Sequence, residues 1–284
     1  MRTLVYSFLL PLSILLLLGA CSPLKLLNAT VSNDGYTSTL NQTYGEQLRQ
    51  QLNIHVPNTV KNNTDVVIFY YGGRWQSGNK EDYTFIADAF TSKELITVIP
   101  DYRIYPDVDW REFINDGAMA YQWVYDNIAR FGGNPERIFI MGHSAGAHIA
   151  AMVTTRQSLI GNAGKHPCGF IGLAGPYDFL PIRDADIKRV FSSANDLQET
   201  QPITFVSKDN PDMLLLHGLD DTTVKPGNST RMVARVKQVG GRAQAKLYPG
   251  VDHTDILISL SSTFRGYSPA LADSIGFMQK TQCK

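Results

Sequence analysis

The sequence has little cysteine, no excess charge of either sign and no apolar run long enough to cross a membrane. Only three of its 284 residues are cysteine, and 26 basic residues balance 26 acidic ones. A neutral balance argues against a surface that binds nucleic acid or another polyanion. Internal repeats, heptads and low-complexity tracts are absent, as are metal-ligand spacings and phosphate-binding loops, so no metal or other cofactor is implied. The apolar content of 43% suffices for one large core or two small ones.

The first 20 residues have the pattern of a secretory signal peptide. Arg2 supplies a positive charge, and residues 9–18 form an apolar stretch that is too short to span a bilayer. The quartet LGAC that ends at Cys21 resembles the lipobox of bacterial lipoproteins, in which the cysteine becomes the lipidated first residue. The alternative is an ordinary cleaved signal in which Cys21 has no role.

The residue after Cys21 bears on where such a lipoprotein would reside. Ser22 stands there in place of aspartate, and the resemblance then favours the outer membrane over retention at the inner one. The lipobox resemblance therefore predicts a protein of the bacterial cell envelope that is lipid-anchored at the periplasmic face of the outer membrane. Residues 21–35 would form a flexible stalk, and residues 36–284 the folded domain.

If Cys21 is lipidated, two cysteines remain. Cys168 comes just before an apolar run that reads as a strand, and Cys283 ends the last expected helix. A helix that covers a parallel sheet runs antiparallel to the strands, so both cysteines should fall near the same edge. Thiols that meet in an exported protein usually join. A Cys168–Cys283 disulfide is one expectation, and two free thiols are the other.

Strand and helix patterns alternate along the chain. Strands are predicted from apolar, β-branched runs, and helices from segments with helical spacing of apolar residues. The expected strands are 52–56, 66–71, 95–100, 137–141, 169–174, 213–217 and 243–248, and the expected helices are 83–92, 111–131, 145–156, 227–239, 254–262 and 269–282. This order predicts one α/β domain with a mostly parallel central sheet flanked by helices. Residues 176–208 have weak periodicity and are expected to form a small cap insertion near the active site.

The pentapeptide Gly142-His143-Ser144-Ala145-Gly146 lies where an expected strand meets an expected helix. A G-x-S-x-G pattern at such a junction is the signature of a nucleophile elbow, a strained turn that presents the serine. A Cβ atom at either glycine would clash with the adjoining strand or helix. The alternative is a glycine-rich turn in which Ser144 caps the following helix.

A nucleophilic serine needs a base and an acid, which in this fold follow it along the chain. His253 lies in a loop just after the last expected strand and is the candidate base, whereas His217 ends a strand and suits packing or a hydrogen bond to the next loop. The acid comes from Asp220 or Asp221, again just after a strand. Adjacent side chains point in different directions, so only one of these carboxylates can face His253.

An oxyanion hole is the third requirement. The N–H group of Ala145, the residue after the nucleophile, supplies one donor. The loop Gly72-Gly73-Arg74-Trp75, after an early buried strand, is the candidate source of the others, since glycine lets the backbone approach a substrate closely. A plain glycine turn is the alternative.

Together these motifs resemble the α/β-hydrolase superfamily, in particular bacterial carboxylesterases of the hormone-sensitive-lipase and feruloyl-esterase-like groups. The matching segments are YGGRW from Tyr71, DYRIYP from Asp101, GGNPERIFIMGHSAGAH ending at His148, HGLDDTTVKP around Asp221 and LYPGVDH ending at His253. The resemblance implies a Ser144–Asp221–His253 triad and an oxyanion hole built from the N–H groups of Gly73, Arg74 and Ala145.

The chain departs from the family pattern at two positions. Tyr71 stands where histidine is usual, and Arg74 where a third glycine is common. Backbone donors survive an arginine, so the expected oxyanion hole stands. Tyr71 is expected to form hydrogen bonds behind the site. The Arg74 side chain either pairs with a carboxylate of the insertion or lines the acyl site.

The expected function is that of a serine carboxylesterase acting on a small-molecule ester, with no nucleic acid partner. Two alternatives stay open. An amidase or arylformamidase would use the same triad on another bond. A non-catalytic envelope lipoprotein would use the fold for binding, although such proteins normally lose a triad member, and this chain keeps Ser144, Asp221 and His253.

Overall fold

The computed structural model of the protein describes residues 23–28, 31, 34–160 and 166–283. The expected signal peptide and Cys21 lie outside these ranges and stay predictions. Within them, no helix is long and apolar enough to span a bilayer.

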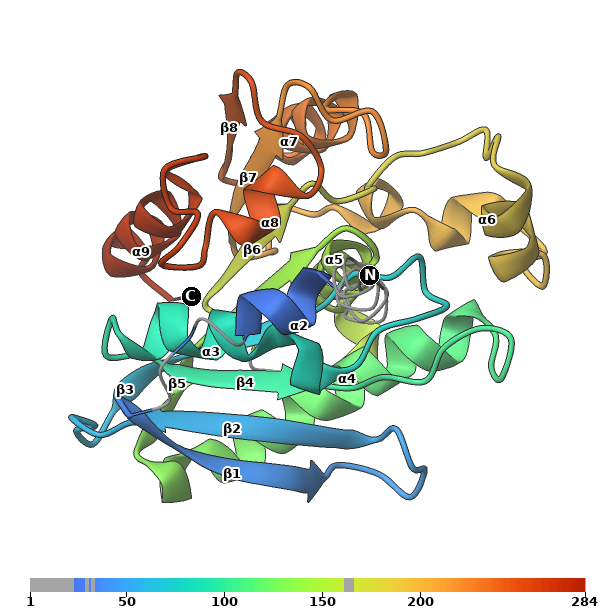
Figure 1. Ribbon diagram of the computed structural model, residues 1–284. Helices are drawn as coiled ribbons and strands as arrows, with labels where there is room; N and C mark the ends of the chain where they lie inside the picture. The colour runs from blue at the N-terminus through green and yellow to red at the C-terminus, as the bar shows by residue number, and fades with distance from the viewer. Residues whose placement is uncertain (1–22, 29–30, 32–33, 161–165, 284) are drawn as a thin grey trace, which may run out of the picture.

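An eight-stranded sheet forms the centre of the molecule, in the order β1-β2-β4-β3-β5-β6-β7-β8 (Figure 1). The strand β2 runs antiparallel to both of its neighbours, and all pairings from β4 to β8 are parallel. The strands are β1 (Tyr36–Thr43), β2 (Gln51–Pro57), β3 (Thr64–Tyr70), β4 (Ile96–Pro100), β5 (Gly133–His143), β6 (Gly169–Leu173), β7 (Asp212–Gly218) and β8 (Ala243–Tyr248).

Helices cover both faces of this sheet, as the alternating sequence pattern predicts. The helices α3 and α9 lie on one face and α4 and α5 on the other (Figure 1). The α-helices are α2 (Pro23–Asn28), α3 (Thr84–Thr91), α4 (Trp110–Asn127), α5 (Ala145–Thr155), α6 (Ala185–Val190), α7 (Gly227–Gln238), α8 (Asp255–Ile258) and α9 (Ala270–Lys280). Short 3-10 helices are η2 (Lys80–Tyr83), η3 (Ile128–Phe131), η4 (Gln157–Leu159), η5 (Leu197–Thr200) and η6 (Pro202–Phe205). This is the α/β-hydrolase fold, and the predicted fold class is confirmed.

Most expected elements are present, with small changes at their ends. The strands β4, β6 and most of β7 are buried along their length, which explains why they read as continuous apolar runs. The expected helix 111–131 is α4 continued by η3, and the expected helix 254–262 shrinks to the single turn of α8.

The strand β1 is the one strand of the sheet that the sequence pattern missed. It lies at the edge of the sheet, and most of its residues are exposed, so it lacks the apolar run that marks the central strands. Its pairing with β2 is also irregular between Thr39 and Gln42, where Asn41 has a φ of 55°. A polar edge strand of this kind is held by backbone pairing rather than by side-chain burial.

The structure departs from the expected flexible stalk at residues 23–28. These residues form α2, whose Leu27 is 5% exposed. Asn28 ties the helix to the domain through two hydrogen bonds. Its Nδ2 donates to the Glu81 carbonyl at 3.0 Å, and its Oδ1 accepts from the Phe85 N–H at 3.1 Å. The helix therefore docks on η2 and the start of α3.

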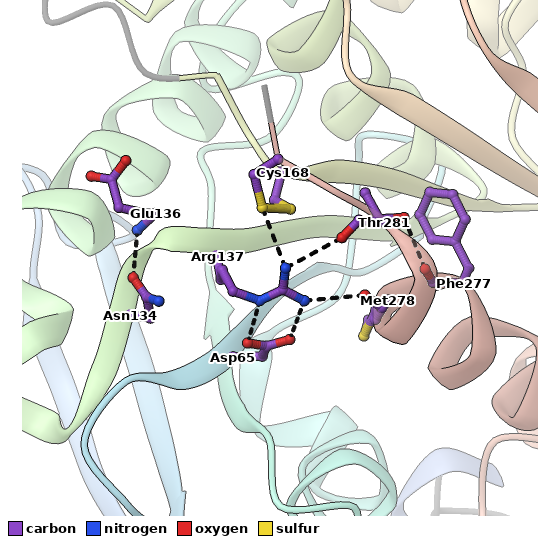
Figure 2. The surroundings of a disulfide bond; sticks show 9 residues. Asp65, Asn134, Glu136, Arg137, Cys168, Phe277, Met278 and Thr281 are labelled. Carbon is purple, nitrogen blue, oxygen red and sulfur yellow. Dashed lines mark hydrogen bonds and ion pairs between the residues drawn. A yellow bond between two sulfur atoms is a disulfide. The ribbon is translucent and has the colours of Figure 1, made fainter.

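Cys168 and Cys283 form a disulfide with a Cα–Cα distance of 4.5 Å (Figure 2). Arg137 lies beside it, in a bidentate ion pair with Asp65 at 2.6 and 2.7 Å. The same guanidinium donates to the carbonyls of Met278 and Thr281 (Figure 2). The disulfide and Arg137 thus fasten the end of the chain to the central strands.

We predict that replacing both cysteines, as Cys168→Ser with Cys283→Ser, lowers the free energy of unfolding by about 2–4 kcal/mol. The disulfide joins residues 115 positions apart, and the unfolded chain gains conformational freedom when it is lost. Urea unfolding under oxidising conditions measures the difference.

Adding reductant provides the control for this comparison. It should lower the stability of the parent protein and leave the double variant unchanged. Equal stability of the oxidised parent and the variant would contradict the prediction.

Candidate active site

Ser144 occupies the sharp turn between β5 and α5. Its φ of 54° and ψ of −123° are strained for a residue with a side chain. A Cβ atom at Gly142 would lie 2.5 Å from Gly146 backbone atoms, and one at Gly146 would lie 2.0 Å from the Tyr70 carbonyl oxygen. The crowding expected from the G-x-S-x-G pattern is therefore real, and it comes from the neighbouring strand β3 as well as from the turn itself.

Three side chains from separate loops meet at this turn. His253 follows β8, and its Nε2 lies 2.9 Å from the Ser144 Oγ. Its Nδ1 lies 2.7 Å from Oδ2 of Asp221, which follows β7. The carboxyl ends of these parallel strands meet at one edge of the sheet, which brings the residues together. A hydroxyl, an imidazole and a carboxylate in this chain of contacts can move a proton away from the hydroxyl.

The two adjacent carboxylates, Asp220 and Asp221, differ in burial and in their contacts. Asp221 is 2% exposed, whereas Asp220 is exposed to solvent. The Asp221 Oδ1 accepts hydrogen bonds from the N–H groups of Thr223 and Val224, at 2.9 and 2.8 Å. Burial raises the pKa of Asp221. Hydrogen bonds from His217 and His253, together with the electrostatic effect of His253, lower it by more and hold that pKa well below its usual range. The carboxylate therefore stays ionised.

His217 forms the hydrogen bond to the following loop that its position suggested, and it also contacts Asp221. Its Nε2 lies 3.1 Å from the Asp221 Oδ2 and 2.8 Å from the Val224 carbonyl, and its Nδ1 lies 2.8 Å from the Ser229 Oγ. The contact with Asp221 was missed from the sequence. The His-Gly-x-x-Asp spacing is the only local signal for it.

The loop after β3 reaches Ser144 from the other side. Gly73 has a φ of 129°, and a Cβ there would lie 2.2 Å from the Ser77 carbonyl oxygen, so this position requires glycine. The Gly73 carbonyl accepts from the N–H groups of Gln76 and Ser77, which tightens the loop. Gly73 and Arg74 line a cavity together with Ser144. The Ala145 N–H opens α5 and has no partner within that helix.

The Arg74 side chain pairs with a carboxylate of the insertion, one of the two roles left open by the sequence. Its Nη2 lies 2.9 Å from Oδ1 of Asp184, the residue that caps α6. Both side chains are about half exposed, at 47% and 50%, so this pair adds little to stability. It does connect the loop after β3 to the insertion across the site.

Tyr71 forms hydrogen bonds behind the site, as expected. Its hydroxyl donates to Asp101 Oδ1 at 2.6 Å and accepts from Arg49 at 2.9 Å. Lys80 Nζ contacts the other oxygen of Asp101 at 3.0 Å. Burial raises the pKa of Tyr71 well above its usual value, so it stays a neutral donor. The network fixes the end of β3, from which the Gly73 loop starts.

Two cavities flank Ser144. The larger, of about 760 Å³, has a mostly apolar lining that includes Leu27, Leu257 and His253. The smaller, of about 460 Å³, is lined by the Ala145 turn, Trp75 and the insertion between β6 and β7. Both volumes suit small-molecule sites. Among the residues that the structure describes, no cluster of His, Cys, Asp or Glu could hold a metal ion.

Comparison with known proteins identifies the family. Residues 52–236, more than half of the chain, match the BD-FAE family model. The chain belongs to the BD-FAE family. Curated relatives of this BD-FAE protein include a probable isoprenylcysteine alpha-carbonyl methylesterase of Arabidopsis thaliana, 28% identical over 76% of the chain and 50% of the relative. Carboxylesterase NlhH of Mycobacterium tuberculosis is 29% identical over 72% of the chain and 60% of the relative. The chain thus spans half to about three fifths of these relatives.

A solved structure agrees with the BD-FAE assignment at the level of the fold. A truncated carbohydrate esterase from gut microbiota superimposes with a TM-score of 0.77. It is 23% identical, and the match covers 88% of this chain and 98% of that one. At this identity the likeness speaks for the fold alone.

Buried histidines next to the site make the stability of this BD-FAE domain sensitive to pH. The His148 Nε2 donates to the Thr200 carbonyl at 2.8 Å, and its Nδ1 accepts from the Trp75 indole at 3.2 Å. Burial lowers the pKa of His148 to about 4. Burial, followed by the neighbouring His253, lowers the pKa of His143 to about 3. Both side chains are therefore neutral in the folded protein at neutral pH.

We predict that the free energy of unfolding falls as the pH drops from about 6.5 to 4. In this range the unfolded chain protonates these histidines, whose ordinary pKa is about 6.5, and the folded protein does not. Each residue contributes on the order of 3 kcal/mol to the fall. Denaturant unfolding at a series of pH values measures the slope.

His148→Gln is the informative variant for this slope. Glutamine can donate to Thr200 and accept from Trp75, but it does not titrate. The variant should show a shallower loss of stability towards acid, whatever its stability at neutral pH. An unchanged slope would contradict the assignment.

Proposed function

We propose that this protein is a serine carboxylesterase that hydrolyses small-molecule carboxylic esters through an acyl-enzyme on Ser144. In this proposal His253 takes the proton of the Ser144 hydroxyl as the hydroxyl attacks the ester carbonyl. Asp221 orients the imidazole and stabilises its protonated form. Water then attacks the acyl-enzyme with His253 as the base, which releases the acid.

The observation that carries the proposal is the continuous hydrogen-bonded chain at the elbow. Ser144 to His253 and His253 to Asp221 measure 2.9 and 2.7 Å, within the range that proton transfer needs. An ionised Asp221 facing Nδ1 favours the tautomer in which Nε2 is free to accept the serine proton. Membership of the BD-FAE family and relatives named as esterases point the same way.

Stabilisation of the oxyanion is assigned to three backbone N–H groups. Those of Gly73 and Arg74 come from the loop after β3, and that of Ala145 comes from the start of α5. Donors fixed by the backbone stabilise developing negative charge without reorganising during the reaction. The strain at Ser144, Arg74 and Trp75, all with positive φ, is consistent with a preorganised site.

We predict that Ser144→Ala and Asp221→Asn each lower kcat for p-nitrophenyl esters by about 10³-fold or more, because they remove the nucleophile and the group that orients its base. Release of p-nitrophenol across a series from acetate to palmitate measures the loss. The same series reports the preferred acyl length.

Matched controls separate the chemistry from the fold. Ser158→Ala changes an exposed serine, and Asp220→Asn changes the exposed neighbour of Asp221. Both should retain nearly the activity of the parent. Equal losses in Asp220→Asn and Asp221→Asn would refute the assigned acid. If the folded parent hydrolyses aryl formamides or amides but no ester, the amidase alternative holds; turnover of neither class would favour the binding lipoprotein.

We also propose that the protein is exported and lipid-anchored through Cys21 in the bacterial outer membrane. Support comes from the LGAC quartet and the short apolar stretch before it. Expression in a bacterium fed with labelled palmitate should yield a labelled membrane protein, and Cys21→Ala should abolish the label. Persistence of the label in that variant would reject the anchor.

A further inference from the structure

The two cavities beside Ser144 differ in which catalytic-site residues line them. The large cavity is lined by His253 and its neighbours, by His143 and by the Gly72–Arg74 loop, but not by Ala145. The small cavity is lined by Ala145 and Trp75, but not by His253. Ser144, Arg74 and Thr223 line both cavities. The cavities therefore adjoin at Ser144, with His253 in the wall of the large cavity and Ala145 in the wall of the small one.

This difference decides where each half of an ester binds, given the proposed serine esterase mechanism on which this inference rests. Acylation forms the bond from Ser144 Oγ to the acyl carbon and breaks the bond from that carbon to the alcohol oxygen. The proton from Oγ passes through His253 Nε2 to the departing oxygen. The alcohol must therefore leave on the side of His253, within hydrogen-bond reach of its Nε2.

We propose that the large apolar cavity binds the alcohol half of the substrate and that this half is an apolar group. The acyl half then binds in the smaller cavity beside Ala145. Away from Ser144, the large cavity is lined by aliphatic and aromatic side chains from three separate parts of the chain, namely Leu24, Leu27, Tyr83, Leu257, Ile258 and Phe264. A lining of this kind excludes water and favours an apolar ligand.

The helix α2 forms part of the wall of this cavity and is anchored to the rest of the domain. It supplies Leu24 and Leu27 from the segment that we expected to be a flexible stalk. Both hydrogen bonds of the Asn28 side chain hold it against η2 and α3. Figure 1 shows α2 between α3 and α8. The helix α8 contributes Leu257 and Ile258 to the lining of the same cavity. The N-terminal segment thus takes part in substrate selection.

The test uses the acyl-enzyme, from which the first alcohol has already departed. An added alcohol competes with water for the acyl group, and it enters through the site that the leaving alcohol used. With p-nitrophenyl acetate as donor, the products are acetic acid and the new acetate ester. The ratio of ester to acid, measured with methanol, 1-butanol and 1-hexanol at equal concentration, reports binding of the alcohol half alone.

In the full-length parent protein the ratio should rise with the length of the alcohol. Leu27→Ala in α2 and Ile258→Ala in α8 should each lower the hexanol-to-methanol ratio by about tenfold, since they remove apolar contacts to the longer chain. Two variants from separate elements guard against loss of one by misfolding. The readout is a partition ratio, so it does not depend on the fraction of active protein.

Two further variants serve as controls. Leu48→Ala changes a leucine that is 93% exposed and lines neither cavity, and it should behave as the parent. Ile182→Ala changes the lining of the small cavity, so it should alter the preference for acyl length and leave the alcohol ratio unchanged.

The opposite pattern would overturn the assignment. If Leu27→Ala and Ile258→Ala shift the acyl-length preference and leave the alcohol ratio unchanged, the large cavity holds the acyl half. A parent ratio that does not rise with alcohol length would likewise reject an apolar alcohol site. Absence of p-nitrophenol release by the folded parent is a different result: it removes the proposed esterase mechanism itself.

Discussion

The close approach of α5 to β3 is the constraint on which the rest of the site depends. A Cβ atom at Gly146 would clash with the backbone of β3. Because Gly146 lacks this atom, the first turn of α5 can pack directly against the end of that strand. The turn that results holds Ser144 in a conformation that is unfavourable for a side-chain residue. Burial of the central strands supplies the stability that offsets this strain.

The other parts of the site are placed relative to that turn. Asp221 is fixed by two backbone N–H groups and by His217, so its free direction is towards His253. The Gly73 loop is fixed from behind by the Tyr71 and Asp101 network. The side chains of Asp221, His217, Tyr71 and Asp101 are buried, whereas Ser144 lines the two cavities. Preorganised catalysis requires side chains that are held in place by buried contacts beside an accessible reacting group.

The N-terminal segment contributes to the lining of the larger cavity beside Ser144. In composition residues 21–35 look like a linker, yet α2 packs beside the site and contributes Leu24 and Leu27 to the larger cavity. The insertion between β6 and β7 lines the smaller cavity, and the Arg74–Asp184 pair connects it to the Gly73 loop. Segments outside the central sheet thus contribute to the lining of both cavities beside Ser144.

The mostly parallel sheet, the elbow at Ser144, the candidate base and the loop of the candidate acid could all be predicted from the residues alone, because buried strands and strained glycine turns need particular residues in a local order. The sequence did not predict β1 or α2, since a polar edge strand and a six-residue helix are held by contacts with distant parts of the chain. The folded arrangement was needed to show that Asp221 rather than Asp220 faces His253, that Arg74 pairs with Asp184, and that Ser144 lines two cavities. Those are matters of side-chain direction and of contacts between segments far apart in the chain, which sequence spacing cannot fix.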